Sequence, residues 1–144
     1  MTNYKKTVAL DFDGVIHSYT SKWQGASIIP DPPVEGAHEA IKELRKRFKV
    51  VILSTRANDP DGYVAMQRWL SEHGIEVDGI AGEGKPKAIL YVDDRGFRFD
   101  GNWGSVLKAL ENGSDGVEPW NRQNVKQEQV RNDRTKTTLL EKTV

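Results

Sequence analysis

The chain has 144 residues, of which 37% are hydrophobic and 29% are charged, so it holds enough apolar material for one core with a well-hydrated surface. Lysine plus arginine and aspartate plus glutamate both number 21, and this zero net charge argues neither for nucleic acid nor against a phosphate substrate. The absence of cysteine excludes disulfides, thiolate metal sites and cysteine nucleophiles. No apolar run approaches the roughly 20 residues that span a bilayer, and the N-terminus shows no apolar signal segment, so we expect a cytoplasmic protein.

Three short apolar runs without polar alternation are typical of strands buried on both faces, as in parallel sheets. Two stretches between them repeat apolar residues at helical spacing, and a third such stretch follows. The predicted strands are residues 7–12, 49–55 and 88–94, with a shorter one at 77–81, and the predicted helices lie within residues 32–48, 61–75 and 103–113. This alternation predicts an α/β fold, a three-layer sandwich around a central, mainly parallel sheet.

Two segments fall outside this alternation. Residues 17–33 hold three prolines and Gly25 without a helical period, and we expect them to form a loop or a small flap. From residue 114 to 144 the composition turns polar, which is typical of a terminal extension. The predicted organisation is therefore one domain over residues 1–113, followed by a C-terminal extension over residues 114–144.

Each of the three strongest predicted strands ends in polar side chains. Because ligands bind beyond the carboxyl ends of parallel strands, we expect these groups to meet at one edge of the sheet. Packed carboxylates require protonation or a cation, and oxygen ligands favour Mg²⁺ working with a phosphate. A carboxylate can also act as a nucleophile or as a general acid and base. The groups are Asp11 and Asp13 at the end of the first strand, Ser54, Thr55 and Arg56 at the end of the second, and Asp93 and Asp94 at the end of the third.

Three further residue types complete this predicted phosphate site. Gly14 permits a tight turn and a close approach of backbone N–H groups to an anion. A hydroxyl at Ser54 or Thr55 can donate to a phosphoryl oxygen. A lysine can neutralise the charge of the transferring group, and both Lys85 and Lys87 lie just before the third strand. The sequence does not choose between these two lysines.

At this point ALDFDGVI, VVILSTR and KPKAILYVDD resemble, in order, the four motifs of the haloacid dehalogenase (HAD) superfamily of phosphohydrolases. The resemblance implies a HAD-like Rossmannoid fold with a small flap in place of a cap domain. It implies that Asp11 is the nucleophile, Asp13 the general acid and base, Ser54 the hydroxyl of the second motif and Lys85 the first choice for the motif lysine. It also implies Mg²⁺ held by Asp11, the Asp13 backbone carbonyl and the pair Asp93 and Asp94, with Asp93 in direct contact.

The substrate is left between several classes. STR and VDDR together resemble the 3′-phosphatase domain of phage-type polynucleotide kinases, which implies that Arg56 and Arg95 hold a nucleotide phosphate; nucleotidases with the same core are a close alternative. The expected partner is a phosphorylated small molecule or a nucleic-acid end, and an uncapped site also suits a protein partner or an oligomer. The alternatives are a non-catalytic binding module and a phosphatase acting on a sugar phosphate or a phosphoprotein.

Less specific interpretations stand beside these. Arg56 and Arg95 can simply pair with the carboxylates, a role as plausible from sequence as substrate binding. His17 is interpreted as a flap residue rather than a catalyst. Trp23 can stack on a base, but a packing role within the flap is favoured, and Trp69 is expected in the core.

Overall fold

The computed structural model describes residues 4–111 of the chain. The chain divides into two compact units, Met1–Asp93 and Asp94–Val144. The predicted extension over residues 114–144, and the predicted domain end at residue 113, lie outside the described residues. Within residues 4–111, no helix combines the length and the apolar character that crossing a membrane requires.

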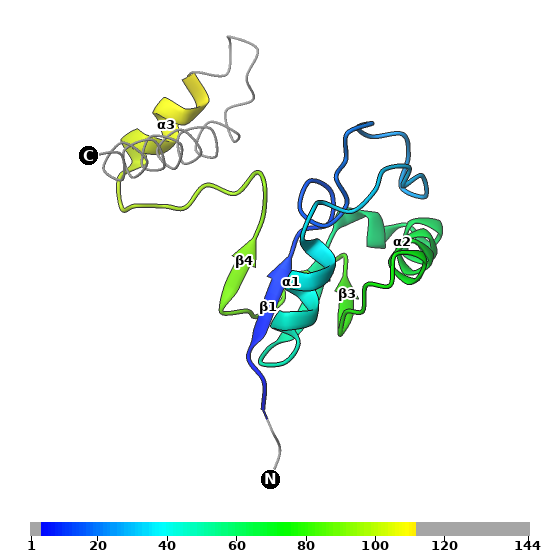
Figure 1. Ribbon diagram of the computed structural model, residues 1–144. Helices are drawn as coiled ribbons and strands as arrows, with labels where there is room; N and C mark the ends of the chain where they lie inside the picture. The colour runs from blue at the N-terminus through cyan, green and yellow to red at the C-terminus, as the bar shows by residue number, and fades with distance from the viewer. Residues whose placement is uncertain (1–3, 112–144) are drawn as a thin grey trace, which may run out of the picture. The chain divides into compact units, whose positions relative to one another are not determined.

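The first unit is built on a four-stranded sheet in which every pairing is parallel, with the strand order β3-β2-β1-β4 (Figure 1). Helix α1, Ala37–Leu44, follows β1, and helix α2, Pro60–Glu72, follows β2. The strands are β1, Thr7–Leu10; β2, Lys49–Leu53; β3, Gly79–Ala81; and β4, Leu90–Val92. This parallel sheet, together with three helices in the described residues, confirms the predicted α/β sandwich.

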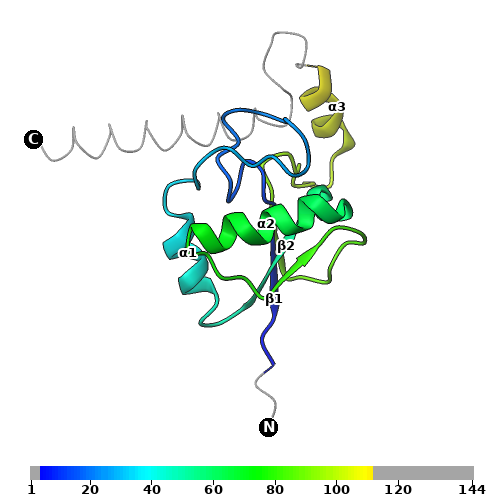
Figure 2. The same ribbon diagram turned by 90° about the vertical axis from the view of Figure 1, so that its right-hand side faces the viewer.

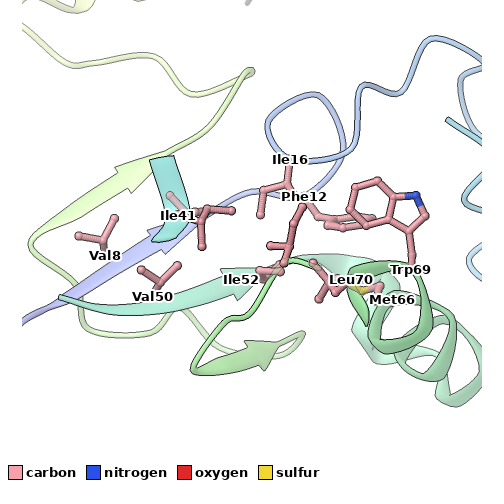
Figure 3. Packing of buried hydrophobic residues seen from close by; sticks show 11 residues of the cluster. Val8, Phe12, Ile16, Ile41, Val50, Ile52, Met66, Trp69 and Leu70 are labelled. Atoms are coloured by element: carbon pink, nitrogen blue, oxygen red, sulfur yellow. The ribbon is translucent and has the colours of Figure 1, made fainter. Parts of the chain in front are cut away.

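The core lies between the sheet and side chains of both α1 and α2. Alternate residues of β1 and β2 point into it, as the period of two along a strand requires. Ile41 is the buried residue of α1, and α2 contributes a larger set around Trp69, the residue predicted for the core. Figure 3 shows the packing of the principal members, which are Val8, Phe12, Ile16, Ile41, Val50, Ile52, Met66, Trp69 and Leu70.

Helix α2 begins where its sequence provides a cap. The carboxylate of Asp59 accepts hydrogen bonds from the backbone N–H groups of Asp61 and Gly62, at 2.8 and 3.2 Å. Pro60 occupies the first helical position, where its missing N–H costs nothing and its fixed φ suits the helix. The start of α2 is therefore specified by this cap and by Pro60.

Strand β4 departs from the expectation of a strand buried on both faces. Leu90, Tyr91 and Val92 are 55%, 39% and 38% exposed. β4 lies at the edge of the sheet and pairs with β1 on one side. An apolar run therefore predicted the strand correctly but not its burial, since edge and central strands share this composition.

The flap over residues 17–33 lies beyond the carboxyl ends of the strands (Figures 1 and 2). Short antiparallel pairing closes its base: Ser18 N–H donates to the Pro32 carbonyl at 2.9 Å, and Val34 N–H donates to the Ile16 carbonyl at 2.8 Å. Between these ends, Tyr19 and Lys22 have φ of 60° and 61°, in the left-handed region that costs a non-glycine residue about 1 kcal/mol or more. The flap therefore has a defined conformation with backbone strain at Tyr19 and Lys22, and favourable contacts elsewhere in the flap must offset this strain.

The second unit, within the described residues, contains helix α3, Trp103–Glu111. Its start is fixed by two side chains, because Asp100 accepts from Asn102 N–H at 2.9 Å and Asn102 accepts from Gly104 N–H at 2.8 Å. The rings of Phe99 and Trp103 lie 5.0 Å apart. The helix predicted within residues 103–113 is therefore present.

Candidate active site

The register of the parallel strands brings Asp11 beside Asp93. Leu10 of β1 pairs with Val92 of β4, so the residue after each strand reaches the same level of the sheet. The Asp11 N–H donates to the Val92 carbonyl at 2.8 Å, which extends the ladder by one residue beyond β1. The two carboxylates predicted to share a site therefore leave neighbouring strands at adjacent positions.

Three carboxylates form a cluster at this edge. Oxygens of Asp11, Asp93 and Asp94 lie within 4.8 Å of one another. Such a group repels itself unless it is protonated or binds a cation, and an oxygen-only donor set suits Mg²⁺ better than a softer metal. The residues present therefore fit a magnesium ion, which Asp11 and Asp93 would hold from adjacent strands.

Asp13 lies in a tight turn that directly follows β1. Gly14 has φ of 84°, and its N–H donates to the His17 carbonyl at 2.8 Å, while the His17 N–H donates to the Phe12 carbonyl at 2.9 Å. The turn is the one predicted at Gly14, but in this structure that N–H bonds to the protein's own backbone. This turn reverses the direction of the chain, so the His17 side chain lies against the Asp13 carboxylate.

Each oxygen of the Asp13 carboxylate has its own protein partner. Oδ1 lies 2.8 Å from His17 Nδ1, and Oδ2 accepts from Arg56 Nε at 2.8 Å. The Asp13 side chain keeps 19% exposure, whereas both partner side chains are fully buried. The buried side chains of His17 and Arg56 thus orient the Asp13 carboxylate, and its remaining side reaches solvent.

Arg56 is a buried residue whose guanidinium contacts both Asp13 and the flap. Its side chain has no exposed surface, and the Trp23 ring centroid lies 4.6 Å from Cζ. Of the two roles that the sequence left open, these contacts favour pairing with a carboxylate over contact with a substrate. Nη1 donates to three flap carbonyls, those of Gly25, Ala26 and Ile28, at 2.9, 2.8 and 3.2 Å.

Ser54 and Thr55 mark the exit of β2. Ser54 is buried, and its Oγ accepts from the Arg56 N–H at 3.2 Å, which caps a 3₁₀ turn over Thr55–Asn58. Thr55 is exposed. The strand ends two residues earlier than predicted because this cap turns the chain, and the same cap directs the Arg56 side chain inward.

The three remaining predicted site residues are cations near β4. Lys85 and Lys87 are both exposed, and Lys85 Nζ lies 4.3 Å from the centroid of the Tyr91 ring. Arg95 is exposed and belongs to the second unit. The choice between the two lysines, and the substrate contact predicted for Arg95, remain predictions.

The sequence interpretation missed a polar chain that runs from Asp13 into the flap. His17 Nε2 accepts from the Asp31 N–H at 3.1 Å, and the Asp31 carboxylate accepts from the Ser21 hydroxyl at 2.5 Å and the Ser21 N–H at 2.8 Å. The Ser21 hydroxyl in particular holds the pKa of Asp31 below its ordinary value. The available signal was a histidine directly after the apolar pair Val15 and Ile16, four residues beyond Asp13.

Comparisons with known proteins give two partial similarities. No protein-family model matches the chain. A protein described as "Uncharacterized protein in adh 3'region", from Clostridium beijerinckii, is 29% identical over 94 residues, which cover 56% of this chain and 31% of that protein. A solved structure described as "Structure of Pnkp1/Rnl/Hen1 complex" is similar with a TM-score of 0.47 and 21% identity, over 82% of this chain and 37% of that one. The chain thus spans about a third of the length of either protein.

Proposed function

We propose that this chain is a Mg²⁺-dependent phosphomonoester hydrolase that works through an aspartyl-phosphate. The observation that supports it is the convergence, beyond adjacent parallel strands, of a carboxylate cluster at Asp11 and Asp93 with the separately held carboxylate of Asp13. These two environments suit two different tasks, because clustered carboxylates favour a bound cation, whereas His17 and Arg56 orient Asp13 for proton transfer.

In this proposal an oxygen of Asp11 attacks phosphorus in line, and the bond between phosphorus and the ester oxygen breaks. Asp13 gives its proton to that leaving oxygen. A water then attacks the phosphorus of the aspartyl-phosphate, Asp13 takes the proton of the water, and inorganic phosphate leaves Asp11. Asp11, Asp93 and Asp94 would hold a Mg²⁺ ion, whose charge would neutralise that of the phosphoryl oxygens.

The proposed substrate is a nucleotide or a polynucleotide end. Its support is the resemblance of the STR and VDDR segments to polynucleotide 3′-phosphatases, together with an exposed aromatic ring on the flap, Trp23. A small flap in place of a cap domain suits a long substrate better than a small sugar phosphate. Binding by Arg95 and by one of the two lysines, Lys85 and Lys87, completes this proposal.

The test is phosphate release from a panel of esters in the presence of Mg²⁺. The panel holds nucleoside 3′- and 5′-monophosphates, oligonucleotides with 3′-phosphate ends, sugar phosphates, a phosphopeptide and an aryl phosphate. We expect release from the nucleotide classes by the wild type, and none by Asp11→Asn, which removes the nucleophilic carboxylate but keeps an oxygen that can accept from the Phe12 N–H. Asp61→Asn, at an exposed site in the first turn of α2, is the matched control and should retain full activity.

The outcomes separate the alternatives. Release that persists in Asp11→Asn contradicts the covalent mechanism. Release confined to sugar phosphates or to the phosphopeptide retains the chemistry and replaces the substrate class. No release from any ester by the folded wild type favours a non-catalytic binding module that kept this arrangement.

A further inference from the structure

His17 is an imidazole with no exposed surface that touches the candidate general acid and base. Its Nδ1 lies 2.8 Å from Oδ1 of Asp13, and its Nε2 lies 3.1 Å from the backbone nitrogen of Asp31. The ring stacks on Phe12 with centroids 5.6 Å apart, and it meets the edges of Tyr19 and Trp69 at 6.0 and 5.6 Å. Enclosed in this way, the imidazole cannot reach a substrate and can act only through Asp13.

The two contacts assign the tautomer of this ring. A backbone N–H can only donate, so Nε2 of His17 accepts from Asp31 and carries no hydrogen. The Asp31 carboxylate does not compete as an acceptor, because its Oδ2 lies 3.6 Å from Nε2, beyond hydrogen-bond distance. The ring hydrogen therefore lies on Nδ1 and is donated to Oδ1 of Asp13.

We propose that His17 is a positioning residue that orients the Asp13 carboxylate for proton transfer, an inference that rests on the proposed phosphatase chemistry. His17 holds one oxygen of Asp13 and Arg56 holds the other, so the two donors fix the carboxylate plane. Each carboxylate oxygen has a second lone pair, and the partly exposed side of Asp13 leaves these free for the transferred proton. Asp31 extends the arrangement by fixing the ring that makes the first contact.

Two substitutions of His17 separate its two nitrogens. The amide nitrogen of His17→Asn takes roughly the place of Nδ1 and can still donate to Asp13. The amide of His17→Gln reaches the place of Nε2, so it can still accept from the Asp31 N–H but offers Asp13 no donor. Both variants lose the ring and its packing, so each controls for the general cost of removing an aromatic group from this site.

The measurement is kcat on an alkyl phosphate and on an aryl phosphate, because a basic alkoxide needs protonation far more than a phenolate does. Since general acid catalysis contributes about 10²- to 10⁴-fold, we expect His17→Gln to lower kcat on the alkyl ester about tenfold or more, and on the aryl ester by less than about threefold. His17→Asn should recover most of the alkyl-ester loss. KM should change little in either variant, because His17 does not touch the substrate.

A purely structural role for His17 predicts a different pattern. Equal losses on both esters, or equal losses in the two variants, would overturn the positioning role. If the wild type hydrolyses no ester, the proposed function fails, and nitrogen NMR of His17 decides this inference instead. Protonation at Nδ1, with a shift that changes in Asp13→Ala, supports the contact, whereas protonation at Nε2 overturns it.

Discussion

Replacing Arg56 with methionine should destabilise the first unit, because it leaves the Asp13 carboxylate without its buried cationic partner. Removing one member of a buried ion pair costs about 3 to 5 kcal/mol. Asp13 retains 19% exposure and can regain some hydration, so we expect the lower end of this range, about 3 kcal/mol. The flap carbonyls that Nη1 serves lie near the surface, and water can replace that donor in part.

The assay is urea unfolding followed by tryptophan fluorescence, and Arg56→Lys is the conservative control. A lysine keeps the charge but presents a single ammonium, which can serve Asp13 or the flap carbonyls but not both, so its cost should be intermediate. The double variant with Asp13→Asn isolates the pair. In that background the methionine substitution should cost at least about 1 kcal/mol less, because no buried carboxylate is left uncompensated.

Two results would refute this reasoning. A loss below about 1 kcal/mol in Arg56→Met would mean that the guanidinium contributes only what an exposed ion pair contributes. An unchanged loss in the Asp13→Asn background would mean that Arg56 stabilises the flap through its carbonyl contacts alone. In the second case the two active-site candidates are neighbours without energetic coupling.

Two further substitutions test the metal site and the acid stability. Asp93→Ala should weaken Mg²⁺ binding at least about tenfold in a calorimetric titration, since it removes one of the clustered carboxylates, and unchanged affinity would remove Asp93 from the site. The Arg45 guanidinium, by hydrogen bonding, holds the pKa of Asp78 below its ordinary value, so this stabilisation is present above about pH 4 and is lost as the pH falls through the lower folded-state value. Asp78→Asn should therefore lower the free energy of unfolding at neutral pH and flatten its acid dependence, and an unchanged dependence would contradict the coupling.

Most of the sheet could be predicted because its central strands are continuous apolar runs. The runs behind β1 and β2 differ from the observed strands only at their carboxyl ends, where a turn at Gly14 and a side-chain cap at Ser54 redirect the chain. Local hydrogen bonds of this kind determine the residue at which a strand ends, and the pattern of hydrophobic residues does not predict them. The exposure of β4 was not predictable for a related reason, since the order of strands in a sheet determines which one lies at the edge.

The carboxylate cluster was also predictable, because strand register converts sequence positions into spatial neighbours. The partners of Asp13 were harder to assign. Arg56 lies 43 residues away, and its two possible roles could be separated only by seeing which atoms its guanidinium meets. His17 lies four residues away but in a turn, so neither helical nor strand periodicity predicts that its ring folds back on Asp13.

The contacts of His17 and Arg56 connect the flap to the Asp13 carboxylate, so the flap helps to hold this side chain in place. Arg56 binds flap carbonyls through Nη1 and Asp13 through Nε, and His17 links Asp13 to Asp31 near the C-terminal end of the flap. A flap that swung away as a whole would remove a donor from at least one oxygen of the same carboxylate. The left-handed backbone at Tyr19 and Lys22 is then the conformational cost of closing a short loop around these contacts, and the buried hydrogen bonds offset it. Under the proposed function, a substrate would therefore meet Asp13 on the side that remains exposed, with the flap contacts intact.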